Sequence, residues 1–221
     1  MTKTIEITLY QFDELSDKAK EKARENYTEN WMSHEWYECT YEAMKEDGHH
    51  NYGFNVKDIR FSGFWSQGDG ASWCGSVNVP AWIKSKPSQY QEHPTTQIVL
   101  ALIEEGWVDE QVLVSFSSSH YCQENTMDVG GIDHYYRIEE DVVMAEGMFK
   151  GAQVGDLIKI IDAPHGVLYD MSRELEQDCK AFARTIYREL EDDYRAQTTE
   201  EAIGEAYAIN DVWFTEEGRI A

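Results

Sequence analysis

The 221-residue chain has few basic residues, and this shortage excludes several classes of partner. It carries 19 Lys and Arg against 42 Asp and Glu, which gives a formal net charge of −23. A field of this sign repels nucleic acid and anionic membranes and attracts basic protein surfaces. The sequence therefore predicts a basic protein partner, with no direct binding to nucleic acid or to a membrane. The same acidity would also imitate the phosphate array of DNA or serve solubility alone.

Cysteine and long apolar runs are also scarce. The four cysteines, Cys39, Cys74, Cys122 and Cys179, contain no Cys-x-x-Cys pair, which is typical of reduced thiols in a cytoplasmic protein. The N-terminus lacks the basic and apolar regions of a signal peptide, and no apolar run approaches the length of a membrane span. We expect a soluble protein of the cytoplasm without cofactor or metal, and we interpret the adjacent His49 and His50 as a solvated loop pair.

Signatures of common catalytic and nucleotide-binding sites are missing as well. The sequence has no GxGxxG after a strand, no P-loop, no HExxH and no GxSxG elbow. A relay can be drawn from Ser118, His120 and Asp128, with His120 at an expected strand end and Asp128 on the returning strand. Nothing in the sequence shows that the three converge. His120 and Asp128 are therefore weak catalytic candidates, and a binding protein is favoured over an enzyme.

Apolar periodicity predicts a mixture of helices and antiparallel strands. We expect strands at 2–12, 59–61, 73–79, 112–116, 127–129 and 212–214, and helices at 16–31, 33–46, 94–103, 168–190 and 198–210. The clearest signal runs from Leu168 to Leu190, where apolar residues recur every three or four positions over about six turns. Ser16 is expected to cap the first helix, and Thr198 with Glu201 the last.

These elements predict a single α+β domain over residues 1–221. An antiparallel meander sheet is expected, covered on one face by the N-terminal helices and the long C-terminal helix. Variable loop insertions are expected near 80–95 and 132–167. The first contains three of the four prolines and is predicted to be irregular between Pro80 and Pro94.

Two polar and aromatic loops, each between a pair of strands, form the candidate binding site. The first follows Gly63 in the stretch IRFSGFWSQGDGASW, and the second spans 117–125. If adjacent hairpins place both loops at one sheet edge, their rings, amides and hydroxyls suit a planar polar ligand, a peptide or a loop of a partner protein. The candidate residues are Trp65, Ser66, Gln67, Asp69, Ser119, His120, Tyr121 and Asn125. Mutual packing of the two loops is the alternative interpretation.

Four segments resemble a family of phage and prophage proteins that are loosely labelled antitoxins of toxin–antitoxin stability systems. They are LSDKAKEKARE, FSGFWSQGDGAS, SSHYCQENTMDV and IYRELEDDYRAQTTEEAIGEAYAIN. The resemblance covers most of the chain except about 80–95 and 132–167. It implies a cytosolic accessory protein of a mobile element, and it distinguishes neither catalysis from binding nor one partner from another.

Two functions follow as hypotheses. The first is an acidic phage-type protein that binds and neutralises a host protein, such as a defence factor, a toxin or a DNA-binding enzyme, including by nucleic-acid mimicry. The segment from Glu104 to Glu146 supports it, because eleven acids there face the single base Arg137. The alternative is a small-ligand protein, either an enzyme or a sponge for a nucleotide-like molecule, that uses the two loops. Lys57 and Arg60 are the bases nearest to them in sequence.

Overall fold

The computed structural model describes residues 6–32, 34–104, 106, 108–118, 121–132 and 167–221. The chain groups into two compact units. The terminal unit comprises Met1–Thr40 and Glu189–Ala221, and the sheet unit comprises Tyr41–Arg188. The expected single domain with two insertions stays a prediction, and residues 133–166 of the second insertion lie outside the described part of the chain.

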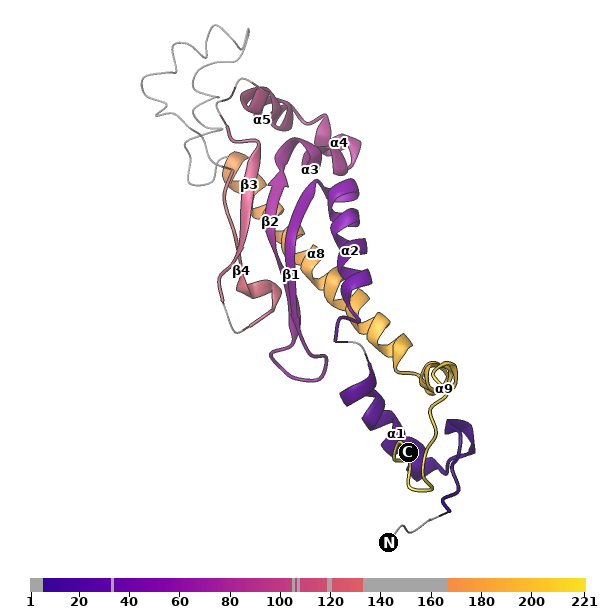
Figure 1. Cartoon of the computed structure of the whole chain (residues 1–221). Coiled ribbons are helices and arrows are strands. Elements are labelled where there is room, and N and C mark those ends of the chain that lie inside the picture. The colour runs from indigo at the N-terminus through magenta and orange to yellow at the C-terminus, as the bar shows by residue number, and fades with distance from the viewer. Residues whose placement is uncertain (1–5, 33, 105, 107, 119–120, 133–166) are drawn as a thin grey trace, which may run out of the picture. The chain divides into compact units, whose positions relative to one another are not determined.

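The sheet unit contains a four-stranded antiparallel sheet in the order β1–β2–β3–β4 (Figure 1). The strands are β1 (Phe54–Ser62), β2 (Gly70–Asn78), β3 (Gln111–Phe116) and β4 (Met127–Val129). Each strand pairs with the next one along the chain, so the sheet is a meander. The predicted α+β class with an antiparallel meander is therefore confirmed.

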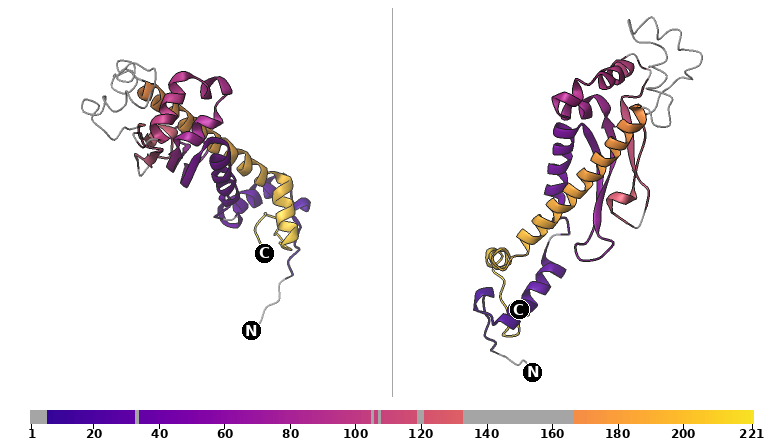
Figure 2. Two further views of the ribbon diagram at one scale, coloured as in Figure 1. Left: turned by 90° about the horizontal axis from the view of Figure 1, so that it is seen from above. Right: turned by 180° about the vertical axis from the view of Figure 1, so that it is seen from behind.

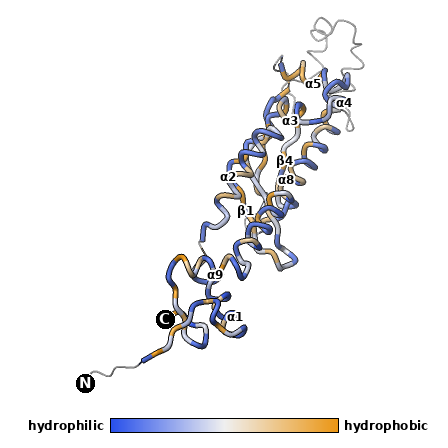
Figure 3. Tube along the Cα trace, turned by 90° about the vertical axis from the view of Figure 1, so that its right-hand side faces the viewer, coloured by the Kyte–Doolittle hydropathy of each residue, from blue (hydrophilic) through white to orange (hydrophobic). Residues whose placement is uncertain are grey.

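Alternating apolar residues give the sheet one buried face. The residues on it with almost no exposure are Phe54, Ile59, Trp73, Val77, Val112 and Val114. The long helix α8 (Val167–Gln197) lies across this face along its sheet-unit part (Figure 2), and polar and apolar residues alternate along it (Figure 3). The predicted helix over 168–190 is confirmed and extends seven residues further.

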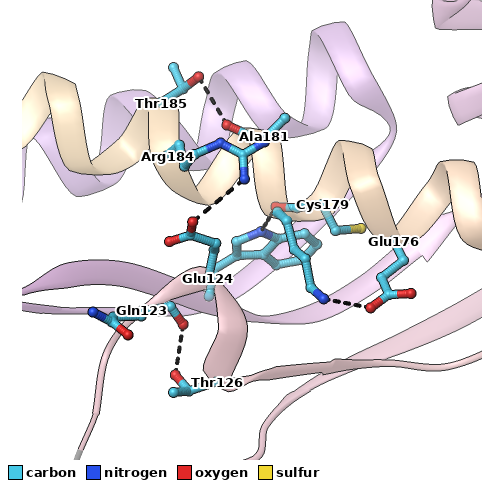
Figure 4. A network of polar contacts seen from close by, with 10 residues as sticks. Gln123, Glu124, Thr126, Glu176, Cys179, Ala181, Arg184 and Thr185 are labelled. Atoms are coloured by element: carbon cyan, nitrogen blue, oxygen red, sulfur yellow. Dashed lines mark hydrogen bonds and ion pairs between the residues drawn. The ribbon is translucent and has the colours of Figure 1, made fainter. Parts of the chain in front are cut away.

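Hydrogen bonding and ring packing hold α8 against the sheet. The indole Nε1 of Trp73 donates to the carbonyl oxygen of Cys179, which is labelled in Figure 4, at 3.1 Å. The ring of Phe182 lies 5.4 Å from that of Phe54 and 6.0 Å from that of Trp73, measured between centroids. A helix from the N-terminal half of the chain also reaches this face. The Tyr41 ring in α2 (Glu38–Asp47) lies 6.4 Å from the Phe61 ring. Of the helix cover that the sequence predicts, the long C-terminal helix and the second N-terminal helix lie on the sheet, whereas the helix expected at 16–31 belongs to the terminal unit.

The segment from Pro80 to Pro94 is helical, so the prediction of an irregular loop there is wrong. It contains α3 (Val79–Ser85) and α4 (Ser88–Gln91), and Pro94 begins α5 (Pro94–Glu104). The three prolines lie at or next to helix starts, where the missing N–H has no intrahelical acceptor. Trp82 and Ile83 of α3 are fully buried and belong to the core.

The terminal unit is built around α1 (Asp17–Asn26) and α9 (Glu200–Ile209). Its core consists of Phe12, Leu15, Ala19, Ala23, Ile203, Tyr207 and Phe214. The hydroxyl of Tyr207 donates to the carbonyl oxygen of Ala23 at 2.9 Å, and Lys20 and Arg24 pair with Glu200 at 2.9 and 3.3 Å. The Lys20 ammonium lowers the pKa of the Glu200 carboxyl, with a smaller effect from Arg24.

Two expectations for the terminal unit are wrong. Residues 6–9 form no strand, and Tyr10 makes only an isolated bridge to Phe214, which also bridges Ile220. The alternation over 6–12 and 212–214 therefore marks isolated bridges beside the core instead of sheet strands, and residues 2–5 lie outside the described part of the chain. Ser16 caps α1 as predicted, but the cap of α9 is Thr199, one residue after the predicted Thr198. No helix in the described ranges is both long and apolar enough to span a bilayer.

Candidate functional site

The loop between β1 and β2 is closed by the carboxylate of Asp69. Its Oδ2 accepts the backbone N–H groups of Trp65 at 2.7 Å and Ser66 at 2.5 Å, while the Asp69 N–H donates to the Ser66 carbonyl at 3.0 Å. Gly63 has φ +43°, and a Cβ there would lie 2.9 Å from Asp69 Oδ2. The carboxylate thus orders the backbone of its own loop.

The second loop packs directly against the first. The amide Nε2 of Gln123 donates to the carbonyl oxygen of Gln67 at 3.2 Å. A Cβ added to Gly70 would lie 3.1 Å from Gln123 Cα, and one added to Gly68 would lie 3.9 Å from the Tyr121 ring. We term residues 63–69 and 121–126 the loop pair. The structure thus brings the two predicted hairpin tips together.

The aromatic side chains of the loop pair divide between the core and solvent. The Phe64 ring lies 5.7 Å from Phe61 and 5.5 Å from Tyr187 of α8, so it joins the loop to the helix. Trp65 and Tyr121 are 67% and 62% exposed. Large exposed rings on an ordered backbone are the kind of side chain that anchors a partner.

An ion pair also connects the loop pair to α8. Arg184 Nη1 lies 3.6 Å from Glu124 Oε1 (Figure 4). Glu124 begins the short η4 helix (Glu124–Thr126), and the Thr126 hydroxyl donates to the Gln123 carbonyl at 2.7 Å. The ion pair attaches the second loop to α8, and the Thr126 hydrogen bond closes the turn within that loop.

The remaining predicted site residues are placed as follows. Ser66 and Asn125 are exposed on the loop pair, whereas Ser119 and His120 lie outside the described residues. Asp128 is exposed on β4 and is in register with Ser115. Binding by these residues and a relay through His120 and Asp128 both stay predictions.

Sequence reasoning missed Gln123. Its side chain makes the hydrogen bond that joins the two loops, but it stands in a run of polar residues, QENT, that gives no reason to prefer it. Its role comes from a hydrogen bond to Gln67 on the other loop, which no local sequence pattern indicates.

A second surface lies on the face of the sheet opposite α8, which no described helix covers. Residues of β1, β2 and β3, with Ser117 and Ser118 after β3, line a trough of about 730 Å³. We term it the sheet trough. It is lined by Asn55, Lys57, Arg60, Cys74, Gly75, Ser76, Gln111, Leu113, Val114, Ser115, Phe116, Ser117 and Ser118.

The shape of the sheet trough depends on an irregularity in β1. The pairing with β2 shifts register between Val56 and Asp58, which makes Lys57 a bulged residue. Gly75 stands opposite with φ +153°, and a Cβ there would lie 2.0 Å from the Asn55 carbonyl oxygen. A side chain at this position would collide with β1, so the floor of the trough has no side chain there.

Within the sheet trough, Arg60 carries a positive charge and the Cys74 thiol is neutral. The Arg60 guanidinium carbon lies 4.0 Å from the centroid of the Phe116 ring, and its Nε lies 3.7 Å from Asp58 Oδ2. Burial, followed by the charge of Asp58, raises the pKa of the Cys74 thiol. The thiol is therefore neutral near pH 7, and the floor carries no thiolate.

Acidic residues are spread over both units. The terminal unit holds 19 acids against 7 bases, and the sheet unit 23 against 12. A cleft of about 760 Å³ in the terminal unit is lined by Glu21, Glu25, Glu216 and Glu217, with Lys18 and Lys22. Five of the eleven acids between 104 and 146 lie in described residues. The acidic surface thus includes the terminal unit, which the sequence did not single out.

No three His, Cys, Asp or Glu side chains in the described ranges are grouped so that they would hold a metal. His49 and His50 are adjacent, with ring centroids 5.2 Å apart, and the Nδ1 of His49 shares a hydrogen bond with Asn55 Oδ1 at 3.0 Å. Both histidines are exposed, in the π-helical turn η3 (Gly48–Tyr52) and not in the loop that the sequence predicts.

The fold and these surfaces define an α+β protein with an ordered aromatic loop pair and an open sheet face. Residues 36–200 match the family described as "Domain of unknown function (DUF8835)", and the chain belongs to this family. No curated protein and no solved structure matches the chain. The resemblance to phage proteins and the antitoxin label stay predictions.

Proposed function

We propose that the protein is an acidic accessory protein that binds and neutralises a basic host protein. The observation that carries this proposal is the loop pair. Trp65 and Tyr121 are 67% and 62% exposed on two loops that Asp69 and the Gln67–Gln123 hydrogen bond hold in place. Tryptophan and tyrosine are enriched among the residues that dominate interface energies.

Order in the free protein supports this role. A loop that is already closed loses little conformational entropy when a partner covers it, so more of the contact energy appears as affinity. The two N–H groups held by Asp69, and the Gln123 bond to the neighbouring loop, provide such order before any partner arrives. The loop pair thus combines large apolar area with a small cost of ordering.

The net charge of −23 sets the sign of the partner. A basic surface is attracted over a distance set by ionic strength, which speeds association and makes affinity fall with salt. The glutamates of the terminal-unit cleft support the same preference. Suitable partners are a defence factor, a toxin or a DNA-binding enzyme. In the last case the carboxylates would occupy the place of DNA phosphates.

Affinity isolation from host lysate tests the proposal. Immobilised wild-type protein is compared with the double variant Trp65→Ala/Tyr121→Ala at about 50 mM and about 500 mM NaCl. Ile209→Ala is the matched control, because this residue is 83% exposed but lies in the terminal unit. We expect a stoichiometric basic partner with the wild type and the control at low salt, and loss of it with the double variant. Equal recovery by all three proteins would contradict the role of the loop pair.

A further inference from the structure

We propose that the sheet trough binds an anionic ligand of nucleotide size, with its phosphate at Lys57 and Arg60 and its planar part against Leu113. This proposal does not rest on the protein-binding function of the loop pair. The sequence placed a possible nucleotide-like ligand at the hairpin tips, whereas the geometry points to the open face of the sheet.

The distribution of charge over the strands selects an anion. Among β1–β4, the basic residues are Lys57 and Arg60, and both line the sheet trough. The acidic residues of the same strands, Asp58 and Asp128, do not line it. In a chain of net charge −23, two cations line this recess, and the nearest strand carboxylate, Asp58, lies at its edge in contact with Arg60 and in register with Cys74. Such a recess concentrates anions against the overall field.

The lining also supplies side chains that donate hydrogen bonds. Hydroxyls come from Ser76 on β2 and Ser115 on β3, and amides come from Asn55 and Gln111. The neutral Cys74 thiol on the floor adds no repulsion toward an anion. The volume of about 730 Å³ lies within the range of about 300–1,000 Å³ that is usual for small-molecule sites.

Arg60 is positioned before a ligand arrives. Its guanidinium lies over the Phe116 ring at 4.0 Å, so the ring restricts the side chain to the trough. Its contact with Asp58 is long, at 3.7 Å, and both side chains are about half exposed. An exposed pair of this kind is weak and yields to a phosphate that contacts both cations.

The apolar part of the ligand is assigned to Leu113. This side chain is 72% exposed in the middle of β3 and shares a row across three strands with Ser76 and Asn55. Small polar neighbours leave its face open, and a flat ring lying on it would cover the apolar surface. A free phosphate would leave Leu113 uncovered, so the geometry favours a phosphate ester over an inorganic anion.

Calorimetric titration of the full chain tests the site. The probes are the 5′-monophosphates of adenosine, guanosine, cytidine and uridine, with adenosine and inorganic phosphate for comparison. At least one nucleotide is expected to bind with one-to-one stoichiometry and at least about tenfold more tightly than adenosine or phosphate. Lys57→Gln and Arg60→Gln are each expected to weaken it by about tenfold or more. Lys84→Gln, which removes one positive charge at an exposed position of α3 outside the trough, is expected to change it by less than about twofold.

Three further experiments complete the test, and the first of them detects folding defects. Circular dichroism establishes that each variant is folded, and Leu113→Ser removes the apolar wall without changing charge, so it is expected to abolish the advantage of nucleotide over phosphate. Amide NMR shifts on titration are expected in β1, β2 and β3. The proposal is overturned if no nucleotide binds at millimolar concentration, if Lys57→Gln and Arg60→Gln bind like the wild type, or if the shifts are confined to the loop pair.

Discussion

At the scale of single residues, Asp69 is the clearest case of a side chain whose position explains its role. Its carboxylate accepts two backbone N–H groups of its own loop, and the residue is partly buried. We expect Asp69→Ala to lower the free energy of unfolding by about 1 kcal/mol, because two charge-assisted hydrogen bonds are lost at a partly exposed site. Urea denaturation followed by circular dichroism measures the change.

Asp58→Ala is the control for this prediction. Asp58 also carries a carboxylate in the same hairpin, but its contact to Arg60 is exposed and 3.7 Å long. We expect a change within about 0.5 kcal/mol for Asp58→Ala. A loss for Asp58→Ala as large as that for Asp69→Ala would show that the two hydrogen bonds of the Asp69 carboxylate add no stability of their own.

Tyr207 makes stability depend on alkaline pH. Burial, with a smaller effect from Tyr27, raises the pKa of Tyr207 to about 12. An unfolded tyrosine ionises near pH 10, so the unfolded chain loses this proton first. The contribution is therefore fully present below about pH 10 and is lost as the pH rises toward 12, at up to about 1.4 kcal/mol per pH unit. Burial raises the pKa of Tyr90 and Cys179 as well, which adds to the same trend.

Tyr207→Phe separates this contribution from the others. At pH 7 the variant is expected to cost about 1 kcal/mol, since the Ala23 carbonyl loses its donor at 2.9 Å. Between pH 10 and 12 its unfolding free energy should fall less steeply than that of the wild type. Urea melts at pH 8, 10 and 11 measure both effects, and parallel curves for the two proteins would refute the assignment.

Residue roles were predictable from the sequence only where a local pattern defines them. Ser16 was identifiable as a cap because a helix of regular period follows it. The chemistry of Asp69 pointed to binding, but its carboxylate closes its own loop, and Gln123 acts through a residue on another loop. Lys57 and Arg60 line the same trough because β1 bulges between Val56 and Asp58, and no sequence motif predicts this bulge.

At the scale of elements, the cap of α9 is a direct test of the structure against the sequence pattern. Thr199 has extended backbone angles, φ −65° and ψ 153°, and its hydroxyl oxygen accepts the Ala202 N–H at 3.2 Å. Thr198 instead donates its hydroxyl to the Tyr194 carbonyl at 2.8 Å. We expect Thr199→Ala to cost about 1 kcal/mol of stability and Thr198→Ala about half as much or less. Thermal and urea unfolding compare them, and the reverse order would place the cap at Thr198.

Elements with a long regular period were predictable, and short ones were not. The period of α8 persists over six turns, so the buried residues Leu175 and Phe182 were identifiable as core positions. The alternation over 6–12 gave no strand, because a strand needs a partner, and these residues have only the bridge at Tyr10. The prolines at 80 and 94 suggested a loop because proline inside a helix interrupts it. In the structure both lie in the first turn of a helix, where proline is tolerated, and the sequence alone does not distinguish these two cases.

At the scale of the whole molecule, net charge dominates the response to solution conditions. With charge −23, carboxylates repel one another more in the compact state than in the expanded chain. Screening by salt reduces this repulsion, so we expect the melting temperature to rise by a few degrees between about 20 mM and 500 mM NaCl. Differential scanning calorimetry measures the rise. A melting temperature that falls or stays constant would show that ion pairs outweigh the repulsion.

The loop pair is proposed to anchor a basic partner that the negative field attracts. The most direct measurement is the affinity of the purified partner, once isolated, for wild-type protein and for Trp65→Ala/Tyr121→Ala at two salt concentrations. We expect a loss of at least about tenfold in the double variant at both concentrations, and a steep fall in wild-type affinity with salt. An affinity that is unchanged by the substitutions, or that does not respond to salt, would contradict it.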